Sequence, residues 1–325
     1  MVHHWFDVDR RAWVAGNHGG PMSRGPDMLS VPWRQLIVLA ASACAACGET
    51  AVSPQATPAP PAPLIVQVEN SDAARPQSGL QGASIVYEYV AEGGVSRFSA
   101  IYPSPPSTKV GPVRSARLAT IALLHQFRGV LVYSGASRYI QSLLDSSGSP
   151  HYNETTAAGD LFRSSGRAAP HNLYTDGAHL ADLLTHASAP SIDYSFFSRR
   201  SAKAPGRSVA SFTVAISPAE APVWTWDAAR GGWTRSEPDT GPLLDAADGR
   251  PVVSTTVIVQ QVAVTEAPQV VDANGAHGVD HQLAGSGAAQ VFVGGKEFAL
   301  SNWDPCGSNS WPPATRPCSE VTGLP

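Results

Sequence analysis

The sequence predicts an α+β protein with two domains behind an exported, disordered leader. Three observations support this prediction. The length of 325 residues suits about two domains, and 43% of the chain is hydrophobic, which is enough to form cores. The 29 glycines and 28 prolines favour turns and short strands over a helical bundle. Only 15% of residues are charged and the net charge is −4, so no basic field favours nucleic acid as a partner.

The first element is an export signal. A positive residue precedes an apolar, small-residue run at Leu36–Ala46, and a Pro-rich segment follows it. These are the features of a secretory signal, and about 11 residues are too few to span a bilayer. We expect residues 28–47 to be the signal peptide, with translation starting near Met28 or Met22. Residues 1–27 would then be a mis-called extension.

Two cysteines compete for the cleavage site. Ala45-Ala46-Cys47-Gly48 resembles a lipobox, whereas Ala41-Ser42-Ala43-Cys44 fits an A-x-A cut equally well. We expect lipidation at Cys47, with Cys44 as the alternative and soluble secretion as the competing hypothesis. A multiply acylated cysteine would hold the protein at the extracytoplasmic face of the cell membrane. Residues 48–63 then form a Pro-rich linker without a core-forming pattern.

Residues 64–200 are expected to form an α/β domain with a mixed sheet and flanking helices. Short β-branched runs bounded by turn residues indicate strands, and apolar residues spaced along one face indicate helices. The predicted strands are Leu64–Val68, Ile85–Val90, Phe98–Tyr102 and Val130–Tyr133. The predicted helices are Ser115–Phe127, with Ser115 as its N-cap, Tyr139–Leu144 and Gly177–His186.

Residues 207–297 follow a basic, Pro-containing joint and are expected to form a smaller, mostly β domain. The predicted strands are Phe212–Ile216, Val223–Asp227, Trp233–Ser236 and the long β-branched run Val252–Val264. Trp224, Trp226 and Trp233 are expected to pack on the faces of this sheet.

Several motif segments, taken in order, resemble the YerB-like lipoprotein family. They cover about residues 64 to 185, and the C-terminal domain matches more loosely at Val252–Val264 and Gly285–Gly294. The resemblance implies an exported, lipid-anchored bacterial protein of two domains whose activity is not established, so no catalytic residue is carried over from it. The segments are Arg75–Leu80, Ile85–Tyr89, Ala91–Phe98, Gly111–Arg117 and Ala169–Tyr174.

The end of the chain departs from the family pattern. From about Phe298 it runs FALSNWDPCGSNSWPPATRPCSEVTGLP, in which we find no strand periodicity. One interpretation of residues 298–325 is a frameshifted end that leaves the second sheet without its closing strands. The other is a genuine tail closed by a Cys306–Cys318 disulfide, which would stabilise the protein by about 3 kcal/mol and which an exported location permits.

The motif segments also contain carboxylates that could belong to a site. A strand at Ile85–Val90 places Glu88 on the same face as two valines, so Glu88 is either half-solvated or buried with a partner. Glu88 or Glu92 would then act as general base in a cleft, beside guanidinium groups that hold an anion. The alternative is a buried Glu–Arg network that fixes a strand to a loop. The candidate partners are Arg97, Arg114 and Arg117.

Gly111–Arg117 is the most suggestive segment. Arg114 and Arg117 flank Ser115, and a helix start beside two guanidinium groups suits an anion. No P-loop spacing is present, so nucleotide hydrolysis has no support. The other expected ligand-binding residues are Arg97, Arg167, His171 and Asn172, and His171 is also a candidate acid or base. The cysteine and histidine spacing predicts no metal site, and we expect no cofactor.

These observations favour binding over catalysis. The primary hypothesis is a membrane-anchored extracytoplasmic lipoprotein that binds a polar or anionic envelope ligand, or a protein partner in the cell wall or membrane. A hydrolase of the cell envelope that uses Glu88 and Glu92 as acid and base is the first alternative. A non-catalytic scaffold, whose tryptophans contact a membrane protein, is the second.

Overall fold

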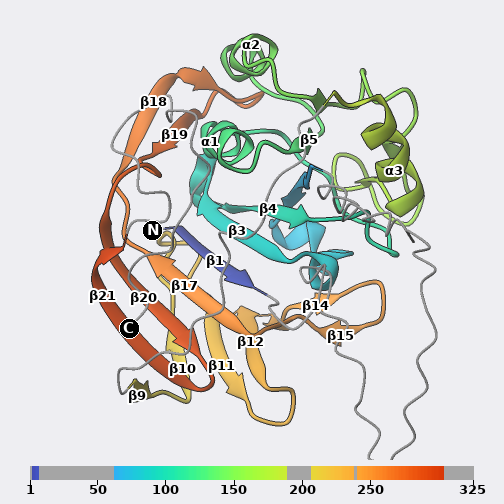
Figure 1. The fold of residues 1–325 in the computed structure, drawn as a ribbon. Helices are drawn as coiled ribbons and strands as arrows, with labels where there is room; N and C mark the ends of the chain where they lie inside the picture. Colours follow the sequence, from blue (N-terminus) through green and yellow to red (C-terminus); the bar gives the residue numbers. More distant parts are fainter. Residues whose placement is uncertain (1, 7–61, 189–205, 238–239, 304–325) are drawn as a thin grey trace, which may run out of the picture. The chain divides into compact units, whose positions relative to one another are not determined.

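The computed structural model describes residues 2–6, 62–188, 206–237 and 240–303, which all belong to one compact unit. Its main feature is a ten-stranded sheet with the order β6-β5-β2-β4-β3-β1-β17-β20-β21-β9 (Figure 1). Strands predicted for both domains contribute to this one sheet. The α+β class is therefore confirmed, and the two regions share a sheet rather than having separate ones.

The first half of the sheet comes from the predicted α/β region. β2 pairs with β5 in parallel, β5 pairs with β6 in parallel, and the pairs β2–β4 and β4–β3 are antiparallel, so the sheet is mixed as expected. The strands span β2 Leu64–Glu69, β3 Ile85–Val90, β4 Ser96–Tyr102, β5 Val130–Val132 and β6 His151–Tyr152. The predicted bounds of β3 match the observed ones.

The second half is antiparallel and begins with a strand from the far N-terminus. β1 lies between β3 and β17 and pairs with both (Figure 1). The strands span β1 Val2–Phe6, β17 Thr256–Gln260, β20 Gly287–Val293, β21 Lys296–Trp303 and β9 Arg207–Ser208. Residues 7–61, including both candidate lipidation cysteines and all but the last two residues of the predicted linker, lie outside the described residues.

Two α-helices cover one face of the first half-sheet, and a third packs with the residues of its other face through Leu180 and Leu183. α1 spans Leu118–Phe127, α2 spans Arg138–Ser146 and α3 spans Gly177–His186. The buried contacts beneath α1 and α2 come from alternate residues of the strands, among them Ile65, Tyr87, Tyr89 and Leu131. The bounds of α3 match the prediction. No helix in the described part of the chain is both long and apolar enough to cross a membrane.

The predicted cap of α1 was wrong. Arg117 is the N-cap, and its backbone N–H donates to the Thr120 hydroxyl at 3.0 Å. Ser115 lies in an extended segment before the helix, because the flanking backbone is used elsewhere. The Arg114 N–H donates to the Gln67 carbonyl at 2.9 Å, and the residue after Ser115 donates to the Gly135 carbonyl.

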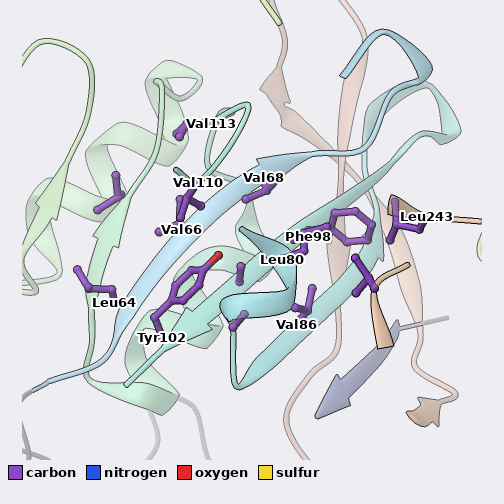
Figure 2. Packing of buried hydrophobic residues seen from close by; sticks show 14 of the residues in the cluster. Leu64, Val66, Val68, Leu80, Val86, Phe98, Tyr102, Val110, Val113 and Leu243 are labelled. Atoms are coloured by element: carbon purple, nitrogen blue, oxygen red, sulfur yellow. The ribbon is translucent and has the colours of Figure 1, made fainter. Parts of the chain in front are cut away.

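The opposite face of the first half-sheet packs against the second region. Figure 2 shows this cluster, in which Phe98 lies beside Leu243 from the C-terminal part and Val66 and Val68 continue the apolar layer along β2. Leu80 and Tyr102 complete the same apolar layer. The first half-sheet is therefore buried on both faces, which explains why β2 is almost continuously apolar.

A smaller antiparallel sheet lies in the second region. Its strands are β10 Ser211–Thr213, β11 Val223–Asp227, β12 Gly232–Glu237, β13 Gly241–Pro242 and β16 Val253–Ser254. Trp224 and Trp233 are fully buried, and Phe212 and Phe292 pack against Trp233. Trp226 is partly buried against Trp233. The tryptophans thus pack on the sheet as expected, which removes two of them from any partner-contacting surface.

Three hairpins complete the described strands. They pair β7 Phe162–Arg163 with β8 Leu173–Tyr174, β14 Leu244–Asp245 with β15 Arg250–Pro251, and β18 Val264–Val271 with β19 His277–His281. The single strand predicted over Val252–Val264 was wrong, since β16, β17 and the start of β18 share this run. Ser254 explains the break, because its hydroxyl donates to the Thr256 carbonyl where the chain passes from one sheet to the other.

The structure also corrects the prediction that no strand continues past Phe298. β21 extends to Trp303, and Phe298 packs with Ile258 and Val291 on the sheet. The turn at Gly294 and Gly295, both with positive φ, joins β20 to β21 and sets this pairing. Residues 304–325, with the proposed disulfide, lie outside the described residues, so the origin of the tail stays a prediction.

Candidate anion-binding site

A buried carboxylate that the sequence analysis did not select organises the motif residues. Glu69 ends β2 and is 2% exposed. The Arg114 Nε lies 3.2 Å from one of its carboxylate oxygens, and the His171 Nδ1 lies 2.9 Å from the other. Ser71 donates to Glu69 from two residues along the chain. Two predicted site residues, Arg114 and His171, therefore meet on a carboxylate instead of lining an empty anion site.

Arg97 and Arg117 extend this group on the face covered by α1. Arg97 lies opposite Glu69 in one strand pair and opposite Tyr89 in the other. Arg97 is 7% exposed, and its Nε has no hydrogen-bond partner among the residues that the structure describes. Burial, together with the Arg117 charge, lowers the pKa of Arg97 to about 10, although the Glu69 charge opposes this shift. Arg117 is paired with Glu92, with its Nε 2.5 Å from the carboxylate.

Glu88 lies on the opposite face of the sheet. It is fully buried beside Phe98, its cross-strand neighbour. Its carboxylate accepts two hydrogen bonds from Arg235 of β12, at 2.7 and 3.2 Å, and one from Ser96 at 2.6 Å. Because β-strand side chains alternate between faces, Glu88 cannot converge with Glu69 or His171.

The residues around Glu88 form what we call the junction cluster, which joins the two regions. Arg235 also pairs with Glu220 and Glu237, and Arg75 reaches the same two carboxylates. Burial raises the pKa of Glu220 from 4.5 to about 7, with further contributions from Glu88 and Glu237. Burial alone would lower the pKa of Arg235, but the surrounding carboxylates raise it. The members are Asn70, Arg75, Glu88, Glu220, Arg235 and Glu237.

These positions do not support the hypothesis that Glu88 and Glu92 act together as acid and base. Glu88 and Glu92 both face guanidinium groups, and they lie in separate networks. An acid–base pair across an open cleft needs two carboxylates that both reach the substrate, and this arrangement does not provide it. The observed networks instead match the alternative hypothesis, in which buried Glu–Arg pairs hold parts of the fold together.

A cavity of about 390 Å³ is lined in part by Arg167, four residues before His171, and by Tyr174, on which the Glu69 charge acts. Lys109 and Arg167 supply positive charge, and its hydroxyls come from Ser78, Thr108, Ser164 and Tyr174. No carboxylate occurs among the described residues that line it. We call it the Lys109–Arg167 pocket. Its remaining lining residues are Gly166, Ala246 and Ala247.

Local contacts position both cations of this pocket. Arg167 donates to the Ala73 carbonyl at 3.1 Å and to the Pro76 carbonyl at 2.7 Å. Those acceptors are uncharged, so they orient the guanidinium without neutralising it. The Lys109 Nζ lies 4.2 Å from the centre of the Tyr174 ring. Burial raises the pKa of Tyr174, and the Arg167 charge acts against this shift, so Tyr174 presents a protonated hydroxyl at neutral pH.

The remaining predicted site residues lie apart from the pocket lining. Ser115 lies 3.4 Å from the Ser134 hydroxyl. Asn172 accepts a hydrogen bond from Arg163 at 2.7 Å within the β7–β8 hairpin. Of the predicted ligand-binding residues, only Arg167 lines the pocket. Within the described ranges, no group of three or more His, Cys, Asp or Glu side chains could hold a metal ion.

Sequence reasoning missed Glu69, Lys109 and Tyr174. A carboxylate that ends a continuously apolar strand is a usable signal, because a charge there needs a partner. Lys109 is one of few lysines and is followed at once by the Gly111 motif. Tyr174 ends another motif segment. The pocket therefore forms where the ends of motif segments meet.

Comparison with known proteins identifies the family. The N-terminal domain described as "Protein of unknown function (DUF3048)" matches residues 48–191, and the corresponding C-terminal domain matches residues 212–310. The chain belongs to the DUF3048 family. "Putative lipoprotein YerB" of Bacillus subtilis (strain 168) is 42% identical over 114 residues. That stretch covers 35% of this chain and 34% of the relative, about a third of its length.

The fold of this chain has also been seen in a crystal. The crystal structure of YerB protein from Bacillus subtilis covers 81% of this chain and 84% of its own, with a TM-score of 0.62 and 23% sequence identity. At that identity the likeness shows the fold alone. The resemblance to YerB-like proteins that the motif segments predicted is confirmed, as is the division into two sequence domains of one family.

Proposed function

We propose that this protein is a lipid-anchored protein of the extracytoplasmic face that binds an anionic envelope ligand in the Lys109–Arg167 pocket. One observation carries the proposal. Two cations and several hydroxyls line a cavity of about 390 Å³, and the described lining holds no carboxylate to neutralise them. A phosphate or carboxylate group is the ligand chemistry that such a site selects.

The anchor rests on the leader sequence and on the family. Leu36–Ala46 has the features of a signal, Cys47 follows it, and residues 48–63 provide a spacer. A relative that is 42% identical over 114 residues bears the name "Putative lipoprotein YerB". Attachment through Cys47, with Cys44 as the alternative, would leave the folded region facing the cell wall.

The Glu69 group supports the pocket without forming it. Arg97, Arg114 and Arg117 face two carboxylates, Glu69 and Glu92, so the group carries excess positive charge near the pocket. This excess favours approach of an anion. His171 bonds Glu69 and so positions the loop that also carries Arg167.

Binding to purified protein tests the pocket. Inorganic phosphate and glucuronate, titrated by calorimetry, probe the two anion classes. We expect the Lys109→Ala/Arg167→Ala variant to lose at least about tenfold in affinity for the preferred anion, since each charge-assisted hydrogen bond contributes about 1.5–3 kcal/mol. Arg163→Ala is the matched control, because Arg163 is a nearby exposed arginine that pairs with Glu154.

The control variant should bind like wild type. Equal affinity of the double variant and wild type for both anions would refute the pocket. Equal losses of anion affinity in Arg163→Ala and in the Lys109→Ala/Arg167→Ala variant would mean that general surface charge, and not the pocket, causes the effect. Heat-unfolding midpoints measured on the same samples separate lost binding from lost fold.

A further inference from the structure

One position in the ten-stranded sheet is filled from far away in the sequence. β1 is only five residues long, yet each residue of Val2–Phe6 has a Cα partner on β3 and another on β17. β3 pairs with β4 on its other edge, and β17 pairs with β20 on its other edge. β1 is therefore what joins the two halves of the sheet at this position (Figure 1).

Translation from Met28 would leave this strand out, and in a chain that starts at Met1 processing would remove it; the second case rests on the anchor part of the proposed function. Cleavage before Cys47 separates Val2–Phe6 from the folded region. β3 and β17 would then face each other with one unpaired edge each. Such rows of free N–H and C=O groups bind extended segments readily.

We infer that the position between β3 and β17 is a strand-acceptor site, which in the processed protein binds an extended apolar segment of a second polypeptide. Val86 and Val257 bound it on one face, and Tyr87 and Ile258 bound it on the other. All four are at most 6% exposed while β1 is in place. The occupant therefore needs apolar side chains on both faces and runs antiparallel to both neighbours.

Charge on the occupant is disfavoured. Glu88 lies on β3 within the site, opposite the second residue of β1. Its carboxylate already accepts hydrogen bonds from Arg235, Ser96 and Asn70, so a cation on the incoming strand is not needed to compensate its charge. The β1 sequence Val-His-His-Trp-Phe contains no carboxylate, lysine or arginine, and three of its five residues are apolar.

Contacts outside the sheet hold the two halves at this spacing. The Arg235 Nη2 lies 2.7 Å from Glu88, and Asp245 accepts from the Gly79 N–H at 2.9 Å. Direct pairing of β3 with β17 would close the gap by about one strand spacing, roughly 4.8 Å. That shift would break these buried bonds, so the site stays open for a strand.

Peptide binding to the processed protein tests the inference. The protein is purified from a bacterial membrane fraction, and its N-terminal mass and labelled-palmitate incorporation show whether the leader has been removed. The probe is a synthetic Val-His-His-Trp-Phe peptide, and the control peptide has the same side chains with alternate backbone amides methylated. We expect the control to bind at least about tenfold more weakly, because methylation removes ladder hydrogen bonds.

Two protein controls accompany the peptides. In the chain expressed from Met1, a Cys44→Ser/Cys47→Ser variant whose N-terminal mass shows the intact leader keeps β1 in place, and the peptide should not bind to it. In the full-length chain, His4→Pro removes a backbone donor from the centre of β1, whereas His4→Val keeps the ladder. We expect the proline variant to bind the peptide and the valine variant not to bind it.

The outcomes separate the two proposals. Absence of palmitate together with a chain that keeps its leader would refute the anchor, and the full-length His4 variants would then decide the acceptor site alone. Failure of both the processed protein and the His4→Pro variant to bind the peptide would overturn the acceptor site. Equal binding of both peptides would overturn it as well.

Discussion

The junction cluster and the Lys109–Arg167 pocket both use arginine, in opposite circumstances. Arg235 is fully buried and faces three carboxylates. Arg167 is partly exposed, donates to two uncharged carbonyls and lines an open cavity. A buried guanidinium without carboxylates would be very costly, whereas a partly solvated one can remain available for a ligand. Burial and pairing therefore separate structural arginines from binding arginines in this fold.

The largest loss in the free energy of unfolding is expected when the buried Arg235 is replaced. Arg235→Met removes the cation but keeps most of the side-chain volume, which leaves Glu88, Glu220 and Glu237 buried together. We expect a loss of about 3–5 kcal/mol in the free energy of unfolding, because an uncompensated buried charge is strongly destabilising. Urea denaturation followed by tryptophan fluorescence measures it, since Trp224 and Trp233 lie in the same region.

Arg230→Met is the matched control. Arg230 pairs with Asp227 at an exposed turn of the same sheet. An exposed pair of this kind contributes at most about 1 kcal/mol. Similar losses in the two variants would mean that the junction cluster does not hold the regions together.

A pH-dependent effect of intermediate size is expected from Glu220. Its pKa in the folded protein is raised to about 7 from 4.5, so the folded state binds more protons between these values. Its contribution to stability is therefore fully present below about pH 4.5 and is lost as the pH rises through 7. Glu220→Gln should flatten this part of the profile.

The measurement is the free energy of unfolding at intervals from pH 4.5 to 8. His281 must be followed in parallel, because burial lowers its pKa to about 4 and gives a slope of opposite sign between pH 4 and 6.5. His281→Leu isolates that slope. Parallel wild-type and Glu220→Gln profiles would show that Glu220 is ionised in the folded protein throughout.

The elements predicted well were those set by local pattern. β3, β11 and α3 have the predicted bounds because a β-branched run or an apolar helical face fixes them without help from distant residues. Ser115 is not the cap because the backbone N–H groups on either side of it are used elsewhere. Those of Arg114 and Ala116 donate to the carbonyls of Gln67 in β2 and of Gly135. Sequence pattern does not show which backbone groups a neighbouring strand will use.

The site was harder to predict because its contacts are distant in sequence. His171 reaches Glu69 across 102 residues, and Arg235 reaches Glu88 across 147. The motif segments correctly marked where polar residues gather. They did not show that strand alternation places Glu88 and Glu69 on opposite faces. That separation is what divides one predicted cleft into a structural network and a pocket.

The smallest change in the free energy of unfolding is expected when Arg167 of the pocket is replaced. Arg167→Ala should change the free energy of unfolding by less than about 1 kcal/mol, because the freed carbonyls of Ala73 and Pro76 can bond to water at this partly exposed position. The same urea series measures it beside Arg235→Met. A loss as large as that of Arg235→Met would make Arg167 a structural arginine and remove the contrast between the two regions. A small loss, combined with weaker anion binding, places Arg167 among residues that the fold positions for a ligand rather than for its own stability.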